Sequence, residues 1–298
     1  MERTDVIEVI KELWECTEAS KRGRALKALQ KTIPDEHQVF FGEFASHLFN
    51  NALDTKESHI IILIHGIHTN GSWQQDVQEQ MDGVPHLRVQ KVGYELVTGL
   101  QFAFLSRSSA IKKVLHEIRT IKREEPIAKL SIIAHSFGTY ITSKIIATQA
   151  DLRFEKIITC GSVMPRDYNW VKHAPYARHG DIINDVGTND WWPIAANCFS
   201  LGYGASGNQG FQSAAVVDRY FEYGHSDFFE PENDHIRKFW RPIFEKGSIP
   251  ASPSKLPKAN LGRLWLCHSI KGKYIPFGLY TLIGAGIIYS SISWAANI

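Results

Sequence analysis

Short runs of apolar residues recur along the middle of the chain, and most of them end at a glycine or a polar loop. The clearest are residues 59–65 (HIIILIH) and 129–135 (KLSIIAH), which are apolar at consecutive positions and short for helices. A strand buried on both faces has this continuous apolar character. Further strands are predicted at residues 87–92, 156–160, 181–186 and 214–223.

Helical periodicity fills the intervals between these strands. The interval 109–124 is the best example, because its apolar residues recur three and four positions apart. Helices are also predicted over residues 72–81, 138–150 and 233–244, and two more within 3–31. Strands that alternate with helices predict an α/β fold, with a mostly parallel, doubly wound sheet covered by helices on both faces.

The same pattern divides the chain into four parts. Residues 1–56 form an N-terminal helical extension, 57–246 the α/β domain, 247–274 a basic linker and 275–298 an apolar tail. The glycine-rich segment 197–211 is expected to be a mobile lid or a rigid Ω-loop.

The tail from Ile275 to Ile298 contains no charged residue. A helix of 24 residues would be about 36 Å long, against a bilayer core of about 30 Å. Tyr274 and Trp294 stand near its ends, as in the aromatic belts of membrane proteins. The tail therefore predicts a C-terminal transmembrane anchor, although a buried helix or a hairpin broken at glycines is the alternative.

Charge changes this picture in one respect. The chain carries a net charge of +2, yet no acidic residue follows Gly247. The basic excess thus belongs to the linker, and no nucleic-acid partner is expected. Because basic residues precede the apolar tail, the positive-inside rule places the body of the protein in the cytoplasm. The basic residues are Lys255, Lys258, Arg263, Lys271 and Lys273.

Candidate chemistry begins where the strand 129–135 ends, in the segment Ala134-His135-Ser136-Phe137-Gly138. A serine hydroxyl is a poor nucleophile at neutral pH and needs an adjacent base. A sharp strand-to-helix turn lifts the side chain clear of the sheet and requires small neighbours, which Ala134 and Gly138 provide. The following helix directs its amino terminus toward developing negative charge. Ser136 is therefore the candidate nucleophile, although a serine that only caps the helix is the alternative.

Another polar loop, HGIHTNG, follows the strand 59–65. Its glycines allow a backbone N–H to point into the same pocket. Two alternatives are a plain βα turn braced by His65, and a metal site at His65 and His68. No acidic or histidine cluster with ligand spacing accompanies these residues, so no metal is expected.

Candidate partners for the serine follow the last two strands. Asp190, in GTNDWWP, could orient an imidazole and stabilise it when protonated. Asp185 and Asp181 compete for this role, but Asp185 lies within the strand and Asp181 at its start. His225, in GHSDFF, is one of thirteen histidines and is distinguished by its place after the last strand.

Together the segments HG, AHSFG, GTND and GHSDFF resemble the α/β-hydrolase superfamily of serine hydrolases, which includes lipases and esterases. The resemblance covers residues 57–245. It implies a mostly parallel eight-stranded sheet and a triad in the chain order serine, acid, histidine. That order corresponds to Ser136, Asp190 and His225 here. Alanine at position 134 replaces the first glycine of the family motif and fits sterically.

The resemblance also implies the function. Backbone N–H groups of Ile67 and Phe137 would form the oxyanion hole, and hydrolysis of a carboxylic ester or thioester would need no cofactor. The superfamily often carries a cap domain in the interval that corresponds to 161–180, which is too short for one here, so the resemblance implies an open pocket. An open site and a membrane anchor suit lipid or acylated substrates. The alternatives are a catalytically inactive binding module at the membrane and an acyltransferase with the same triad. Residues expected to contact substrate are His65, His68, His135, Trp191 and Trp192, although the two tryptophans could instead be buried.

Overall fold

The computed structural model describes residues 28–38, 40–42, 58–66, 72–93, 107–199 and 202–254, together with Glu8 and Ile10. Within this described part, no helix combines the length and apolar character needed to cross a bilayer. The tail 275–298 lies outside the described residues, so the anchor stays a prediction. Most of the N-terminal extension and the linker beyond residue 254 also lie outside the described residues.

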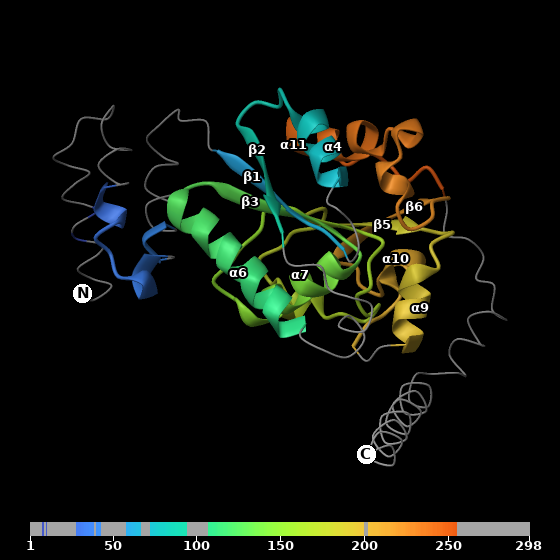
Figure 1. The fold of residues 1–298 in the computed structure, drawn as a ribbon, viewed down its shortest axis with the longest axis horizontal. Coiled ribbons are helices and arrows are strands. Elements are labelled where there is room, and N and C mark those ends of the chain that lie inside the picture. Colours follow the sequence, from blue (N-terminus) through green and yellow to red (C-terminus); the bar gives the residue numbers. More distant parts are fainter. Residues whose placement is uncertain are drawn as a thin grey trace, which may run out of the picture.

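Six strands form one sheet in the order β2-β1-β3-β4-β5-β6, and every neighbouring pair is parallel (Figure 1). The prediction of a parallel α/β sheet is confirmed, and each predicted strand lies within two residues of its observed ends. The described residues contain six of the eight strands implied by the resemblance. The strands are β1 (His59–Ile64), β2 (Leu87–Val92), β3 (Lys129–His135), β4 (Ile157–Cys160), β5 (Ile182–Gly187) and β6 (Val216–Phe221).

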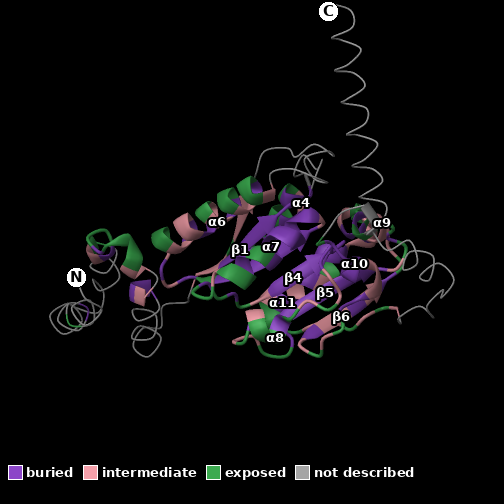
Figure 2. Ribbon diagram, turned by 90° about the horizontal axis from the view of Figure 1, so that it is seen from below, coloured by how far each residue is buried: buried purple, intermediate pink, exposed green. Residues whose placement is uncertain are grey.

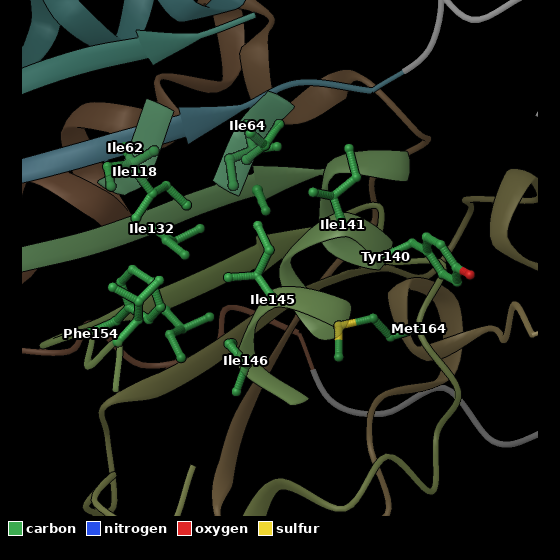
Figure 3. Close-up of a cluster of buried hydrophobic side chains, with 14 of the residues drawn as sticks. Ile62, Ile64, Ile118, Ile132, Tyr140, Ile141, Ile145, Ile146, Phe154 and Met164 are labelled. Atoms are coloured by element: carbon green, nitrogen blue, oxygen red, sulfur yellow. The ribbon is translucent and has the colours of Figure 1, made fainter. Parts of the chain in front are cut away.

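Helices cover both faces of this sheet. On one face, α6 (Arg107–Glu124) and α7 (Phe137–Thr148) pack on alternate residues of the strands, including Ile62 and Ile132 (Figure 3). On the other face, α4 (Ser72–Met81) and the C-terminal helices cover the intervening residues, such as Ile61. The four inner strands β1, β3, β4 and β5 are therefore buried on both sides (Figure 2), which explains the continuous apolar runs of β1 and β3, whereas the edge strands β2 and β6 are partly exposed.

The helix predicted over 233–244 is observed as three consecutive pieces. They are the 3-10 turn η3 (Pro231–Asn233), the π-helix η4 (Ile236–Trp240) and α11 (Arg241–Lys246). Pro242 stands in the first turn of α11 and has no N–H to donate to a preceding carbonyl. The helical ladder is therefore interrupted before α11, and the segment changes its winding.

The segments expected around the pocket are short and packed. The interval between β4 and β5 contains a single short helix, α8 (Trp170–His173), whose Trp170 is buried. Most of segment 197–211 is described, and it contains the end of α9 (Trp192–Phe199) and the whole of α10 (Ser206–Gln209). Ser206 is fully buried and donates a 2.8 Å hydrogen bond to Ser162. The described residues of this segment thus agree with a rigid loop rather than a lid.

The strand order places a topological switch point beside β1. After β1 the chain continues to β2 on one side of that strand and then crosses to β3 on the other. In open α/β sheets, binding sites form at such a switch point, outside the carboxyl ends of the two strands. The loops that begin at His65, after β1, and at Ser136, after β3, lie at this switch point.

Candidate active site

Ser136 occupies the sharp turn between β3 and α7. Its backbone has φ 55° and ψ −123°, a conformation that residues with a side chain rarely adopt. The turn brings the backbones close together, because a Cβ at Gly138 would lie 2.3 Å from the carbonyl oxygen of Ile64. A Cβ at Gly66 would lie 2.7 Å from the Cβ of Ser136. The predicted need for a small residue at position 138 is confirmed.

The three residues of the predicted triad meet above this turn. The Ser136 Oγ lies 3.0 Å from Nε2 of His225, and Nδ1 of the same imidazole lies 2.8 Å from Oδ2 of Asp190. Asp190 is fully buried, whereas the side chain of His225 is 18% exposed. With Nδ1–H donated to the carboxylate, the Nε2 lone pair faces the serine hydroxyl and can accept its proton.

Two hydrogen bonds hold the loop that carries Asp190. The backbone N–H of Trp192 donates to Oδ1 of Asp190 at 3.0 Å, which leaves Oδ2 to the imidazole. The side chain of Asn208, on α10, donates a 2.8 Å bond to the Asp190 carbonyl oxygen. Asn208 was not foreseen from the sequence, because a glycine-rich loop gives no sign of which side chain turns inward.

The two competing carboxylates are engaged elsewhere. Asp181, at the start of β5, forms an ion pair of 2.8 Å with Lys156. Asp185 is fully buried and forms an ion pair of 2.6 Å with Arg219. Burial by itself raises the pKa of Asp185, but the Arg219 guanidinium and the hydrogen bond from His235 bring that pKa below its ordinary value. Of the three carboxylates, it is Asp190 that the structure places against His225.

Two histidines that were expected to contact substrate lie behind the site. His135 is 1% exposed, and its Nε2–H donates a 2.9 Å hydrogen bond to the backbone carbonyl of His225. His65 is 7% exposed, and its Nδ1 lies 2.6 Å from the Gly66 carbonyl oxygen. Burial lowers the pKa of both rings. The sheet edge thus encloses both side chains, His65 bonds within its own turn, and their expected contact with substrate stays a prediction.

Of the other predicted residues, the two tryptophans and Phe137 are described by the structure, and Ile67 and His68 are not. Trp191 and Trp192 are 52% and 67% exposed, and the Trp192 ring centroid lies 6.2 Å from that of His225. The alternative in which both are buried is therefore wrong. Phe137 begins α7 directly after the serine, and its role as an oxyanion donor stays a prediction. Ile67 and His68 lie outside the described residues, so their roles stay predictions. Among the residues that are described, no cluster of acidic, histidine or cysteine side chains could hold a metal ion.

Gly161 is a second residue that sequence reasoning missed. It follows β4 with φ +53°, and a Cβ there would lie 2.9 Å from Cε1 of His225 and 3.0 Å from Nε2 of His135. Only glycine leaves room for both rings. The available signal was its position, directly after a buried strand at the edge where the polar loops gather.

Comparison with known proteins gives a consistent result. Residues 54–160 match the family described as "Putative serine esterase (DUF676)". A search of curated proteins gave no match. The matched solved structures include a predicted CIB-like hydrolase from Thermoplasma acidophilum, at 14% identity and a TM-score of 0.38, covering 62% of this chain and 86% of that one.

Two further solved structures are similar to this chain. The LpqC poly(3-hydroxybutyrate) depolymerase from Bordetella parapertussis is 12% identical, with a TM-score of 0.44, and the match covers 70% of this chain and 86% of that one. A cold-adapted esterase from an Arctic intertidal metagenomic library is 15% identical, with a TM-score of 0.40, covering 61% and 78%. Because these sequence identities and TM-scores are low, the likeness to a fold family rests on the sheet order and serine turn of this chain and on the family match. A parallel sheet wound in this order, with a strained serine turn at its switch point, is typical of the α/β-hydrolase superfamily, and the match of residues 54–160 to a serine esterase family agrees with that likeness.

Proposed function

We propose that this protein is a serine hydrolase that cleaves carboxylic ester or thioester bonds. Ser136 is the nucleophile, His225 is the base, and the Asp190 carboxylate orients His225. One observation carries the proposal: an unbroken hydrogen-bonded relay joins the Asp190 carboxylate to the Ser136 hydroxyl through the His225 ring, at 2.8 and 3.0 Å. The match of residues 54–160 to an esterase family supports it.

The reaction follows from the positions of these groups. Ser136 Oγ attacks the carbonyl carbon while Nε2 of His225 takes its proton, and the Asp190 carboxylate stabilises the imidazolium. The tetrahedral oxyanion is stabilised by the backbone N–H groups of Phe137 and Ile67. His225 then protonates the leaving alcohol or thiol, which departs and leaves an acyl-serine. A water molecule, deprotonated by His225, attacks this ester, releases the carboxylic acid and restores the serine.

The substrate is an acyl group presented at a membrane surface, as a lipid or an acylated protein. Three features support this: the short interval between β4 and β5, two exposed tryptophans beside the acid, and the apolar tail 275–298. Tryptophan is enriched at membrane–water interfaces, where its ring contacts both apolar and polar groups. The tail would tether the catalytic domain on the cytoplasmic side of the membrane.

The test uses the purified full chain and its Ser136→Ala variant as the matched control. Acid release is measured from a short soluble ester, a short thioester, phospholipid vesicles and an acylated peptide. We expect release that depends on Ser136 and is faster from the vesicles or the acylated peptide. Cleavage of short esters alone would contradict the membrane substrate, and no Ser136-dependent release from any of the four would contradict the hydrolase.

Two outcomes of the same assay identify the alternatives. Adding an alcohol or amine acceptor and analysing the products shows whether the acyl group goes to water or to the acceptor. Transfer to the acceptor without free acid would indicate an acyltransferase. A folded protein that binds vesicles without consuming any acyl substrate would indicate a binding module.

A further inference from the structure

The backbone of His225 is anchored to the residue that precedes the nucleophile. His135, the last residue of β3, donates its Nε2–H to the carbonyl oxygen of His225 at 2.9 Å. The next residue, Ser136, contacts the ring of the same histidine through its hydroxyl at 3.0 Å. One strand end thus contacts the proposed base at two points, its backbone and its ring.

Both points limit how far the imidazole can move. The ring of His225 is fixed at Nδ1 by Asp190, but a ring can swing about its own Cα when the loop that carries it shifts. The bond from His135 fixes the backbone of that loop relative to β3. The distance between the base and the serine hydroxyl is therefore set within one rigid strand end, and misplacement of a reacting group by about 1 Å can cost on the order of 10²-fold in rate.

The environment of His135 keeps its ring fixed and uncharged. Its centroid lies 5.0 Å from that of Phe229 and 6.2 Å from that of Trp73, both nearly perpendicular to it. The ring of His225 lies 4.7 Å away. Burial, followed by the proximity of His225, lowers the pKa of His135 well below its ordinary value. A neutral neighbour matters here, because His225 must itself become positively charged during acyl transfer.

The hydrogen bond also defines the tautomer. A carbonyl oxygen only accepts, so the proton of His135 is on Nε2 and Nδ1 is a bare acceptor. Nδ1 is buried and has no hydrogen-bond partner among the described residues. An unpaired buried acceptor destabilises a fold, so packing alone does not account for histidine at this position. Donation to the His225 carbonyl does.

We propose that His135 is a positioning residue: its neutral ring holds the backbone of His225 so that the catalytic imidazole stays within hydrogen-bonding distance of Ser136. The inference rests on the proposed function, since it assigns to His225 the role of base. It replaces the substrate contact expected of His135 from the sequence.

The test compares four variants by the reach of the side-chain donor. His135→Phe retains a ring without a donor, whereas in His135→Gln the amide nitrogen can reach the place of Nε2. His135→Asn carries the same amide on a shorter side chain that does not reach it. His59→Gln is the control, because His59 bonds Ser131 at the opposite end of the sheet. Each is assayed for kcat and KM on a soluble ester, with the thermal unfolding midpoint as a check of folding.

We expect His135→Phe and His135→Asn to lower kcat by about 10²-fold with little change in KM. His135→Gln should recover at least about tenfold of that loss, and His59→Gln should retain the wild-type kcat. The Gln–Asn pair decides the matter even where the Phe variant does not fold, because the two differ in reach alone. A purely structural role would lower the unfolding midpoint without separating Gln from Asn in kcat.

Three results would overturn the inference while leaving the proposed function intact. They are a wild-type kcat in His135→Phe, equal kcat values in the Gln and Asn variants, and an increase in KM alone, which would indicate substrate contact. A wild-type protein without Ser136-dependent hydrolysis would instead contradict the proposed function, and the inference with it.

Discussion

Asp190 and Asp185 are near neighbours in the chain, and each lies within hydrogen-bonding distance of a histidine ring. Asp190 is bonded to Nδ1 of His225 at 2.8 Å, and the opposite nitrogen of that ring faces Ser136. The His225 side chain is partly exposed, so a substrate can approach the relay. In this pair, Nε2 of His225 remains available to accept the proton of the serine hydroxyl.

The second pair differs in every one of these respects. His235 and Asp185 are both fully buried, with 3.0 Å between Nε2 and the carboxylate. Both oxygens of Asp185 also accept from Arg219, at 2.6 and 2.8 Å, and Oδ2 accepts from Trp240 at 2.7 Å. Nδ1 of His235 is buried among aromatic rings, including that of Phe239. Whether an aspartate–histidine pair can take part in proton transfer therefore depends on what else the carboxylate binds and on what the second ring nitrogen faces.

The largest effect should come from removing the proposed nucleophile. Ser136→Ala removes the attacking oxygen and should lower kcat for ester hydrolysis by about 10⁴-fold or more. The variant should keep the wild-type unfolding midpoint, because the side chain lost is small. Steady-state kinetics at saturating ester tests this, and a loss below tenfold would contradict the assigned role.

The same substitution at the two aspartates should separate activity from stability. Asp190→Asn should lower kcat by about 10³–10⁴-fold, because an amide favours the wrong tautomer of His225. Asp185→Asn should leave the kcat of the folded molecules near the wild-type value. It should lower the free energy of unfolding by about 3–5 kcal/mol, because Arg219 would then be a buried charge without a counter-ion.

Kinetics and urea unfolding of both variants test this pair of predictions. The rate is normalised to the folded fraction, so that the loss of stability in Asp185→Asn does not appear as a loss of kcat. A larger fall in kcat at position 185 than at position 190 would reverse the two assignments.

Conservative replacement of the buried arginine should have a smaller effect on stability. Lysine keeps the positive charge but cannot donate to both Asp185 oxygens in the fork geometry of a guanidinium. It also loses the 3.1 Å bond from Arg219 to the Phe239 carbonyl. Arg219→Lys should lower the free energy of unfolding by about 1–3 kcal/mol with an unchanged kcat, as measured by urea unfolding. A free energy equal to that of the wild type would show that the charge alone suffices.

The smallest effect concerns pH. Burial raises the pKa of Asp218 to about 6, despite hydrogen bonds from Asn184 and the Phe211 backbone. The folded state therefore holds this proton more tightly than the unfolded chain, whose aspartates titrate near 4. The contribution of Asp218 to stability is fully present below about pH 4 and is lost as the pH rises through about 6.

Unfolding free energies at several pH values between 4 and 7 test this, with Asp218→Asn as the control. The difference between wild type and variant should fall across that window. Asp185 adds no pH dependence in that window, since its lowered pKa keeps its stabilising effect constant above about pH 4 and confines the loss of that effect to lower pH values. A difference that does not vary with pH would contradict the raised pKa of Asp218.

The sheet and the candidate triad could be predicted from the sequence because both depend on local patterns. Continuous apolar runs identify doubly buried strands, and parallel winding places every following loop at one edge. Ser136, Asp190 and His225 follow from that rule together with the small neighbours of the serine and the chain order that the α/β-hydrolase resemblance implies. The choice of Asp190 over Asp185 followed from one being beyond the strand and the other within it.

The remaining features depend on side-chain direction, which no pattern of types reveals. Arg219 lies within a strand, and nothing in the sequence shows that it points at Asp185 rather than at solvent. His135 is polar and adjacent to the nucleophile, which favoured a substrate contact, yet it points behind the site. Gly161 and Asn208 serve the site through close approach and a single hydrogen bond, and both are visible only in three dimensions.

The most direct test of the account is covalent labelling of the serine. A fluorophosphonate reacts with a serine that an adjacent base activates, and mass spectrometry of the peptides locates the adduct. We predict one adduct, on Ser136, which is absent from Ser136→Ala and still formed by folded Asp185→Asn. A folded wild-type protein that forms no adduct, or an adduct that persists in Ser136→Ala, would contradict the proposed catalytic relay.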